Sequence, residues 1–275
     1  MPELPEVEIA ARNLRSWTRG RTLVAADAAP TARYVFRPST PATFARGIAG
    51  AHVGEIRRVG KHLLVGLERG GAPLGVLAHL GMTGKWLRRR EGEPPTRFSR
   101  ARLHLDDGSV LHFDDLRLFG RLRIVPGARF DAVPEVAALG KDPLADGVDP
   151  DALGAALARS KLPVKVRIMD QAVLAGVGNI YASEACFRAK IDPRRKGPSL
   201  TTREVRALAQ AILAAVKDGI ARQEGPEITY VEEGGENPFR VYGKEGARCP
   251  RCRRGEITRV VQAQRSTFFC PRCQR

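Results

Sequence analysis

Four of the five cysteines in this 275-residue chain lie near its end, at Cys249, Cys252, Cys270 and Cys273. The pattern is C-x2-C, a 17-residue spacer, and a second C-x2-C. Each pair can present two sulfurs to one metal ion, and this spacing is typical of a tetrahedral zinc site with four cysteine ligands. Disulfides are one alternative, which a reducing cytosol disfavours, and an iron–sulfur cluster is another. The spacing therefore predicts one structural Zn²⁺.

The spacer between the two cysteine pairs has the pattern of a β-hairpin. Residues 257–261 and 267–269 are strand-like, and the polar residues 262–266 form a turn that would point Arg265 outward. From residue 243 to 275 there are nine basic and two acidic residues. We therefore expect a small metal-bound hairpin with a cationic tip, suited to contact with phosphate groups.

The whole chain is strongly basic, with 46 Lys and Arg against 30 Asp and Glu and a formal net charge of +16. A fold does not require such a charge, whereas a polyanionic partner does. Nucleic acid is the first candidate and an anionic membrane surface is the second. A merely solubilising surface, or a genome composition that favours arginine, is the structural alternative.

The chain shows neither a membrane span nor a secretion signal. The longest uncharged apolar run near a predicted helix is residues 211–216, whereas a bilayer span needs about 20 such residues. Residues 1–8 are acidic, contain two prolines and lack the apolar stretch of a signal peptide. We therefore expect a cytoplasmic protein associated with the nucleoid.

Residues 1–130 predict a β-rich domain with one helix at its start. Apolar residues recur at helical spacing from Val7 to Leu14, so the first helix should run to about Ser16. Strand patterns follow at 59–67 and 75–79, and residues 102–113 alternate around Asp107-Gly108. An Asp-Gly pair between two such runs is typical of a hairpin turn.

A segment rich in proline and glycine, residues 131–150, is predicted to be a linker, and after it the period changes to that of helices. Residues 151–242 form the predicted helical domain, with helices at 151–160, 165–173 and 180–188 and a capping box from Thr201 to Glu204. The turn at residues 176–178 contains two glycines, and Asn179 is the expected N-cap of the helix that follows. The free N–H groups of such a helix end could bind a phosphate, although most such turns are only structural.

Several motifs together resemble one family. They are Pro2-Glu3-Leu4-Pro5-Glu6-Val7-Glu8, Lys165-x-x-Ile168-Met169-Asp170-Gln171, the stretch Gly176-Val177-Gly178-Asn179-Ile180-Tyr181-Ala182-Ser183-Glu184, and the terminal four-cysteine finger. In this order along the chain they resemble the bacterial formamidopyrimidine-DNA glycosylases, relatives of endonuclease VIII.

The resemblance implies an α+β fold with three parts: an N-terminal β-sandwich with a flanking helix, a helix–two-turns–helix domain, and a zinc-finger β-hairpin at residues 243–275. It also implies that damaged double-stranded DNA is bound between the domains. Nothing in the sequence calls for an oligomer, so we expect a monomer. The implied reaction belongs to base excision repair. It removes oxidised purines, namely 8-oxoguanine and formamidopyrimidines, and then cleaves the strand at the abasic site by β,δ-elimination.

The resemblance assigns chemistry to the first residues. Removal of Met1 would expose Pro2 as a secondary amine, and an α-amino group has a pKa of about 7.7–8.0, so a fraction is uncharged near neutrality. This amine would attack the sugar C1′ to give a Schiff base. Glu3 would be the general acid at the ring oxygen, and Glu6 would position Glu3 or the N-terminus. Charge compensation at a helix N-terminus is the structural alternative for both glutamates.

Other residues match the family's DNA contacts. Lys61 and His79 would contact phosphates, and Met82 would fill the gap left by the everted base. Arg117 would pair with the orphaned base while Phe119 wedges the base stack, which offsets part of the cost of base flipping. An exposed strand lysine and ordinary core packing are the alternatives for Lys61 and Met82.

Three further residues match the family's phosphate clamp, Lys165, Asn179 and Arg265. For Lys165 and Asn179 a helix-surface or capping role is the alternative. Arg265 is grouped with Lys61, Pro2 and Glu3 as part of the catalytic set. The residue before Arg265 is Gln264, where the family usually has glycine, so the tip of the hairpin should differ in shape.

The stretch between residues 219 and 242 departs from the family pattern. It is acidic and looks shorter than the family's Gly- and Thr-rich loop over 8-oxoguanine, so the preferred lesion stays open. Leu4 favours the formamidopyrimidine branch. The alternatives are an endonuclease VIII-like enzyme acting on oxidised pyrimidines or abasic sites and, in a different class, a non-catalytic zinc-finger DNA-binding protein.

Overall fold

The computed structural model describes residues 2–223, 225, 227–228 and 237–275. The chain forms two compact units. The first comprises Met1–Pro2, Glu6–Ala137 and Gln223–Glu233, and the second comprises Glu3–Pro5, Ala138–Arg222 and Gly234–Arg275. The chain therefore passes from the first unit to the second inside the segment 131–150, which the sequence predicts to be a linker.

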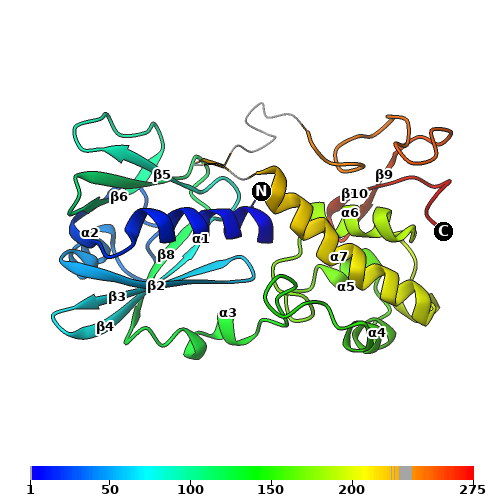
Figure 1. The fold of residues 1–275 in the computed structure, drawn as a ribbon, viewed down its shortest axis with the longest axis horizontal. Helices are drawn as coiled ribbons and strands as arrows, with labels where there is room; N and C mark the ends of the chain where they lie inside the picture. Colours follow the sequence, from blue (N-terminus) through cyan, green and yellow to red (C-terminus); the bar gives the residue numbers. More distant parts are fainter. Residues whose placement is uncertain (1, 224, 226, 229–236) are drawn as a thin grey trace. The chain divides into compact units, whose positions relative to one another are not determined.

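Eight antiparallel strands of the first unit form one hydrogen-bonded sheet in the order β5-β7-β6-β1-β2-β3-β4-β8 (Figure 1). Three of the neighbouring pairs, β2-β3, β3-β4 and β6-β7, are joined by short hairpins, whereas helix α2, Pro41–Ile48, lies between β1 and β2 in the chain. The strands are β1 Thr22–Ala28, β2 Ala51–Val59, β3 His62–Arg69, β4 Ala72–His79, β5 Lys85–Arg90, β6 Ser99–Leu105, β7 Ser109–Asp114 and β8 Arg121–Pro126.

Strand β1 divides this sheet into two halves. Its start, Thr22 and Leu23, pairs with β2, whereas Ala25–Ala28 pairs with β6, and the register shifts between these two stretches. Apolar side chains from both halves, among them Val65 of β3 and Leu111 of β7, line the same apolar interior space. The predicted β-sandwich is therefore confirmed, with the refinement that its two layers belong to a single folded sheet.

Two main helices accompany the sheet. Helix α1, Leu4–Thr18, extends two residues beyond the predicted end, and the Thr18 hydroxyl donates to the Leu14 carbonyl at 2.8 Å. Helix α2, Pro41–Ile48, begins with proline and is capped by the Thr40 hydroxyl, which accepts from the backbone N–H of Thr43. Two short helical segments, η1 Phe130–Ala132 and α3 Pro134–Ala137, come before the chain passes to the second unit.

The hairpins test two sequence predictions. The Asp107-Gly108 turn between β6 and β7 is confirmed, with Gly108 at a φ of 74°. The single strand predicted over 59–67 is wrong, because Gly60 and Lys61 form a two-residue turn between β2 and β3. Gly60 has a φ of 57°, a conformation open to glycine at little cost. This turn places Lys61 at the tip of a hairpin.

Helices dominate the second unit: α4 Pro150–Ala158, α5 Val164–Ile168, α6 Asn179–Ala189, η2 Gly197–Ser199 and α7 Thr202–Arg222. The capping box is confirmed, since the Thr201 hydroxyl accepts from the Glu204 N–H at 3.3 Å and the Glu204 carboxylate accepts from the Thr201 N–H at 2.7 Å. The helix predicted over 165–173 ends early. Asp170 follows α5, and its carboxylate accepts from the Ala172 N–H in a turn that competes with a helix.

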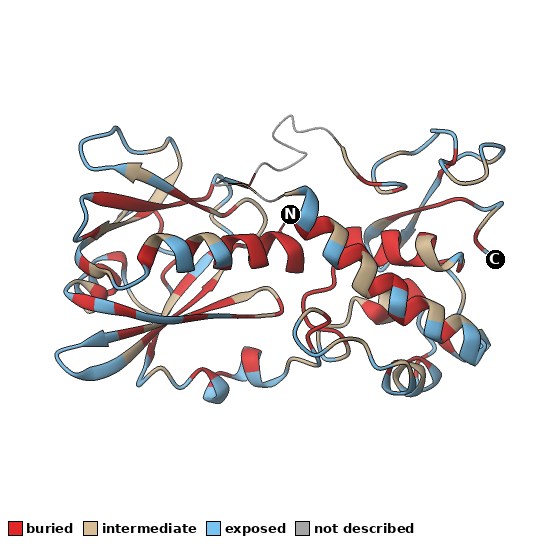
Figure 2. Ribbon diagram, viewed as in Figure 1, coloured by how far each residue is buried: buried red, intermediate tan, exposed pale blue. Residues whose placement is uncertain are grey.

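The two longest helices of this unit, α6 and α7, differ in how much of their surface is buried (Figure 2). Helix α6 is buried at every position from Asn179 to Phe187, whereas α7 buries one stripe and exposes the opposite face. Among the described residues, no helix is both long and apolar enough to cross a membrane.

The C-terminal module is a two-stranded antiparallel hairpin of β9, Thr258–Gln262, and β10, Arg265–Phe269. Strand β9 is shifted by one residue from the predicted 257–261, β10 begins two residues before the predicted 267–269, and the turn is shorter than predicted. Ala263 and Gln264 alone form the turn, with φ values of 46° and 59°. Two successive residues of positive φ are typical of the type I′ hairpin turn, which usually contains Asn and Gly.

Candidate functional site

The carboxylate of Glu3 caps the N-terminus of α6. It accepts hydrogen bonds from the backbone N–H groups of Gly178, Ile180 and Tyr181, at 3.0, 2.9 and 3.2 Å, and its side chain is fully buried. The backbone N–H of Leu4 adds a bond to the Gly176 carbonyl at 3.1 Å. Glu3 is thus held in one orientation by a helix end that lies about 175 residues away in sequence.

The close approach of Glu3 depends on glycine. A Cβ atom on Gly178 would lie 2.3 Å from the Glu3 carboxyl carbon, well inside van der Waals contact. The sequence prediction that Asn179 caps α6 is wrong, because Gly178 is the N-cap residue and Asn179 is the first residue of the helix. The N–H groups that the sequence would offer to a phosphate are instead bonded to Glu3.

Pro2 and Glu6 flank Glu3 along the chain, and both are buried. The Glu6 carboxylate accepts a hydrogen bond from the Gln223 side-chain amide at 3.0 Å. Met1 lies outside the described residues. The positioning role of Glu6 therefore stays a prediction.

A buried polar cluster joins α5, α6 and the C-terminal hairpin. The Lys165 ammonium is fully buried and donates to the Asn179 side-chain oxygen and, at 3.0 Å, to the Thr267 hydroxyl. The Asn179 amide in turn donates to the Ser266 carbonyl at 3.0 Å and to the Tyr242 hydroxyl at 3.3 Å. Burial lowers the pKa of Lys165 to about 8, against the partial compensation of nearby negative groups.

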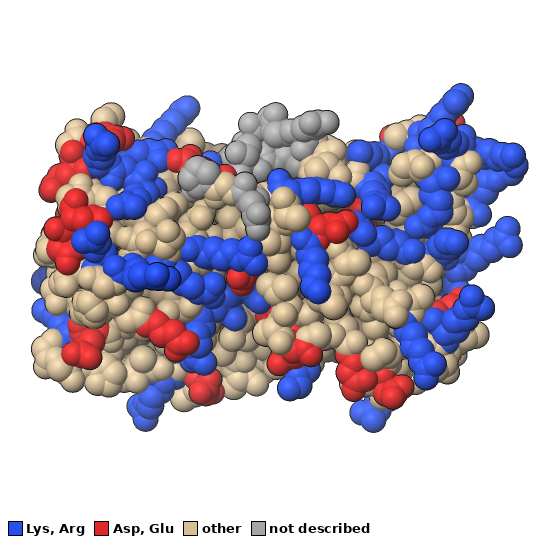
Figure 3. All heavy atoms as spheres, viewed as in Figure 1, with Lys and Arg blue, Asp and Glu red and all other residues tan. Residues whose placement is uncertain are grey.

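Arg265 adjoins this cluster, and the family resemblance implies that Arg265, Lys165 and Asn179 form one phosphate clamp. It is the first residue of β10, its side chain is exposed, and it adjoins Ser266, whose carbonyl accepts from Asn179. On the face drawn in Figure 3, lysine and arginine side chains gather over the C-terminal hairpin module. The arrangement offers several positive groups to an anion.

In the first unit, Lys61 and His79 lie near one another at strand ends. His79 is paired across the β3–β4 ladder with His62, and the two rings are 5.1 Å apart between centroids. Burial, followed by the charges of His62 and Lys61, lowers the pKa of His79 to about 4, so the ring is neutral at pH 7. Its Nδ1 accepts from the Gly81 N–H at 3.0 Å, which leaves the proton on Nε2 as a donor.

Met82, Arg117 and Phe119 occupy two neighbouring loops of the first unit, 80–84 and 115–120. Phe119 is 48% exposed, and the Arg117 guanidinium lies 5.0 Å from the centre of its ring. Arg117 is exposed and Met82 is partly exposed. Large side chains exposed together at a surface are typical of a binding surface.

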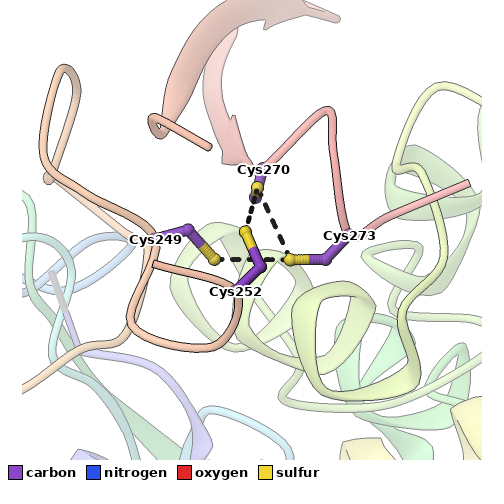
Figure 4. A group of neighbouring side chains, drawn as sticks. All are labelled: Cys249, Cys252, Cys270 and Cys273. Carbon is purple, nitrogen blue, oxygen red and sulfur yellow. Dashed lines mark hydrogen bonds between the residues drawn. The ribbon is translucent and has the colours of Figure 1, made fainter. Parts of the chain in front are cut away.

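The four C-terminal cysteines converge on one point (Figure 4). Their sulfurs all lie within 4.8 Å of one another, and the Cys249–Cys273 and Cys270–Cys273 pairs are 3.4 and 3.5 Å apart. These distances exceed a disulfide bond of about 2.05 Å and approach the edge of about 3.8 Å in a tetrahedron with Zn–S bonds of about 2.3 Å. The donor set therefore fits a single zinc ion.

Two residues that sequence reasoning missed organise these regions. The buried Glu184 carboxylate accepts from the backbone N–H groups of Arg240, Val241 and Tyr242 and so ties α6 to the chain entering the finger. Asp115 makes a similar set of bonds in the first unit. The one sequence signal for these two residues is an acidic side chain at a position that the surrounding apolar residues predict to be buried.

The stretch between residues 219 and 242, which departs from the family pattern, is only partly described. Gly225 and Glu227 belong to the first unit, where the Gly225 carbonyl accepts from the Asn13 amide at 3.1 Å and Glu227 pairs with Arg89. The predicted difference over the lesion otherwise falls on Glu224, Pro226 and 229–236, which lie outside the described residues.

Family models match the chain in three consecutive parts. They are the formamidopyrimidine-DNA glycosylase N-terminal domain at residues 1–122, the formamidopyrimidine-DNA glycosylase H2TH domain at 139–230, and a zinc finger found in FPG and IleRS at 246–275.

Individual relatives match over the full length. The formamidopyrimidine-DNA glycosylase of Paracoccus denitrificans is 40% identical and that of Rhodospirillum centenum is 39% identical, with 100% of each chain covered. The crystal structure of the MutM (FPG) protein of Thermus thermophilus has a TM-score of 0.81 at 37% identity, covering 99% of this chain and 98% of that one. The Lactococcus lactis Fpg in complex with a FAPY-dG-containing DNA has a TM-score of 0.85 at 26% identity, covering 99% and 100%.

Proposed function

The chain belongs to the formamidopyrimidine-DNA glycosylase family, and from that premise we propose that it is a bifunctional DNA glycosylase and AP lyase. Its substrate is double-stranded DNA that carries an oxidised purine, 8-oxoguanine or a formamidopyrimidine. The Lactococcus lactis relative with a FAPY-dG-containing DNA supports this substrate class. The observation that carries the proposal is the buried Glu3 carboxylate, held by three backbone N–H groups directly after Pro2.

The reaction begins at the amine of Pro2 once Met1 is removed. The amine nitrogen forms a bond to C1′, and the bond from C1′ to the damaged base breaks, with a proton taken up by the leaving base. Glu3 donates a proton to the sugar ring oxygen as the ring opens, which leaves a cationic iminium at C1′. The hydrogen bonds to α6 hold the carboxylate in place before substrate binds, so little reorganisation accompanies proton transfer.

Strand cleavage follows from the iminium. It acts as an electron sink, so loss of a C2′ proton expels the 3′ phosphate, and a second elimination expels the 5′ phosphate. Lys61 and Arg265 are cations suited to these phosphates, and the neutral His79 offers an Nε2–H donor. Lys165 and Asn179 complete the phosphate clamp in the second unit.

Borohydride trapping tests this chemistry. The protein should form a covalent adduct with abasic DNA when borohydride reduces the iminium, and intact-mass analysis of the active species should show Met1 absent. An extension in front of Pro2 should abolish trapping. Full lyase activity from protein that retains Met1 would overturn the Pro2 mechanism, and absence of any adduct would leave a DNA-binding protein without this activity.

Zinc is proposed to hold the finger and to take no part in the reaction, because four cysteine ligands leave no open coordination position. Cys270→Ser should lose zinc and weaken DNA binding by displacing Arg265. Metal analysis of the intact protein should find one zinc per chain. A chelator that stops the reaction while DNA stays bound would contradict a purely structural role.

The phosphate and base contacts can be separated by two variants. Arg265→Ala should weaken binding to all lesion duplexes alike and reduce the salt slope by about one. Arg117→Ala should blur the preference for the base opposite the lesion, at a cost of about 1–3 kcal/mol. Binding of both variants to one lesion opposite each of the four bases, at several salt concentrations, distinguishes the two roles, and a swapped result would reverse them.

The preferred lesion requires a direct comparison. A panel of duplexes with 8-oxoguanine, a formamidopyrimidine, an oxidised pyrimidine or an abasic site should show fastest release of the oxidised purines. Faster release of the oxidised pyrimidine would favour the endonuclease VIII-like alternative.

A further inference from the structure

The loop that carries Arg117 and Phe119 has a strained backbone. Leu118, between them, has a φ of 59°, in the left-handed region that a bulky side chain rarely adopts. This conformation turns the chain so that Arg117 and Phe119 are both exposed and stack on each other. Such strain persists only where surrounding contacts over-determine the backbone.

The contacts that hold this loop converge on one carboxylate. Asp115 is fully buried, and one of its oxygens accepts from the Thr83 hydroxyl at 2.6 Å and from the Arg117 N–H at 3.2 Å. The other oxygen accepts from the Gly120 N–H at 2.8 Å. Both ends of the strained segment are therefore bonded to the same side chain.

Thr83 extends this control to the second loop. Its hydroxyl donates to Asp115 and also accepts from the Arg117 N–H at 3.1 Å, and it follows Met82 directly in the chain. The two loops also touch closely, since a Cβ atom on Gly81 would lie 2.4 Å from the Phe119 carbonyl carbon. Met82, Arg117 and Phe119 are thus carried by one interlocked unit.

We propose that Asp115 is a positioning residue that holds Met82, Arg117 and Phe119 as a preformed wedge, with the Thr83 hydroxyl as its partner. The inference rests on the proposed function and on the roles that the family resemblance implies for these three side chains around the everted base. A wedge that is already formed avoids the entropy of ordering two loops at the moment of base flipping.

The test is Asp115→Asn, because every partner of this carboxylate is a donor. A carboxamide accepts at one oxygen only, and its NH₂ group would face a second donor. The matched control is Asp114→Asn. Asp114 is the neighbouring residue and is also buried, but its carboxylate accepts from the Phe98 N–H at 3.3 Å and not from residues 115–120. Thr83→Val removes the hydroxyl at constant shape and serves if Asp115→Asn fails to fold.

Three measurements distinguish positioning from a general loss of stability. Asp115→Asn should lower kcat/KM for lesion excision about 10- to 100-fold and flatten the preference for the opposite base. A 2-aminopurine opposite a tetrahydrofuran abasic analogue should lose its fluorescence response to bound protein, whereas Asp114→Asn should retain it. In an Arg117→Ala/Phe119→Ala background, Asp115→Asn should add little, because the wedge it positions is gone. Thr83→Val should act in the same direction with a smaller effect.

The outcomes separate this inference from the proposed function. An unchanged opposite-base preference and fluorescence response in Asp115→Asn or Thr83→Val, with both lost in Arg117→Ala/Phe119→Ala, would overturn the positioning role alone. An effect of Asp115→Asn that adds fully in the Arg117→Ala/Phe119→Ala background would also overturn it. If Arg117→Ala/Phe119→Ala itself changes neither readout, the wedge role in the proposed function fails instead.

Discussion

Two buried carboxylates organise the two units in different ways. Glu3 receives its three backbone N–H groups from a regular helix end that is distant in sequence, and the close approach is made possible by Gly178. Asp115 accepts from backbone N–H groups only two and five positions away and from the Thr83 hydroxyl, and the loop around it contains the strained Leu118. The distant helix end fixes the Glu3 carboxylate, whereas Asp115 holds an unfavourable loop mainly through N–H groups close to it in sequence. If this contrast holds, variants at Glu3 and Gly178 should have larger effects than a variant in the strained turn at Gln264.

The largest effect is expected from Glu3→Gln. It removes the transferable proton and leaves one acceptor oxygen for three N–H groups, so single-turnover base excision should fall about 10²- to 10⁴-fold. Glu184→Gln is the matched control, because it alters another buried carboxylate of the same helix region that also accepts three backbone N–H groups. Equal losses of excision rate in the two variants would mean that Glu3 acts only as a helix cap.

Gly178→Ala tests whether close packing fixes Glu3. The new Cβ would collide with the carboxyl carbon, so Glu3 should be displaced and excision should fall about 10²-fold while zinc content is unchanged. Gly154→Ala in α4 is the control, since its Cβ would lie 3.5 Å from Val205, an ordinary contact, and helix propensity should slightly stabilise it. Near-normal excision by Gly178→Ala would show that Glu3 needs no fixed orientation.

The pKa of Lys165 predicts opposite pH trends for binding and stability. Because burial lowers it to about 8, the ammonium loses its proton between pH 7 and 9, and affinity for a duplex with a tetrahydrofuran site should fall about 3- to 10-fold. The unfolded chain keeps this proton up to about pH 10. It therefore binds more protons than the folded chain above pH 8, and this residue makes folding more favourable as pH rises through that window.

Lys165→Arg separates these trends, since arginine stays charged over the whole range. Its DNA affinity should vary less between pH 7 and 9 than that of the unaltered protein, as measured by fluorescence anisotropy at constant salt. If the DNA affinities of the two proteins changed with pH in parallel, titration of Lys165 would not be the cause of the change.

The smallest effect concerns another turn with positive φ values, Ala263-Gln264, to which no buried carboxylate of the described residues is bonded. Gln264 has a φ of 59° where glycine would fit, so Gln264→Gly should stabilise the finger hairpin by about 1 kcal/mol. Amide hydrogen exchange of β9 and β10 should slow in this variant and quicken in Gln262→Gly, where the backbone is extended. Faster exchange in Gln264→Gly would mean that the turn is not strained.

Much of the fold could be predicted because the signals are local. The Asp107-Gly108 turn, the Thr201–Glu204 capping box and the cysteine spacing each depend on a few neighbouring residues, whose preferences a short stretch of sequence records. The resemblance to a family added the candidate residues. Predictions failed where a local pattern was compatible with two structures. The apolar residues on either side of Gly60-Lys61 fit one continuous strand as well as two strands joined by a turn.

The amino-acid sequence by itself determined the charge of the chain, the metal-ligand set and the position of Pro2 and Glu3 at its start. Only the tertiary structure decided that Glu3, rather than Asn179, satisfies the end of α6, and that Asn179 instead joins Lys165 to the finger. The physical reason is that a backbone N–H group donates to the acceptor that tertiary packing places next to it. When that acceptor comes from a segment about 175 residues away, no local period or propensity in the sequence records the pairing.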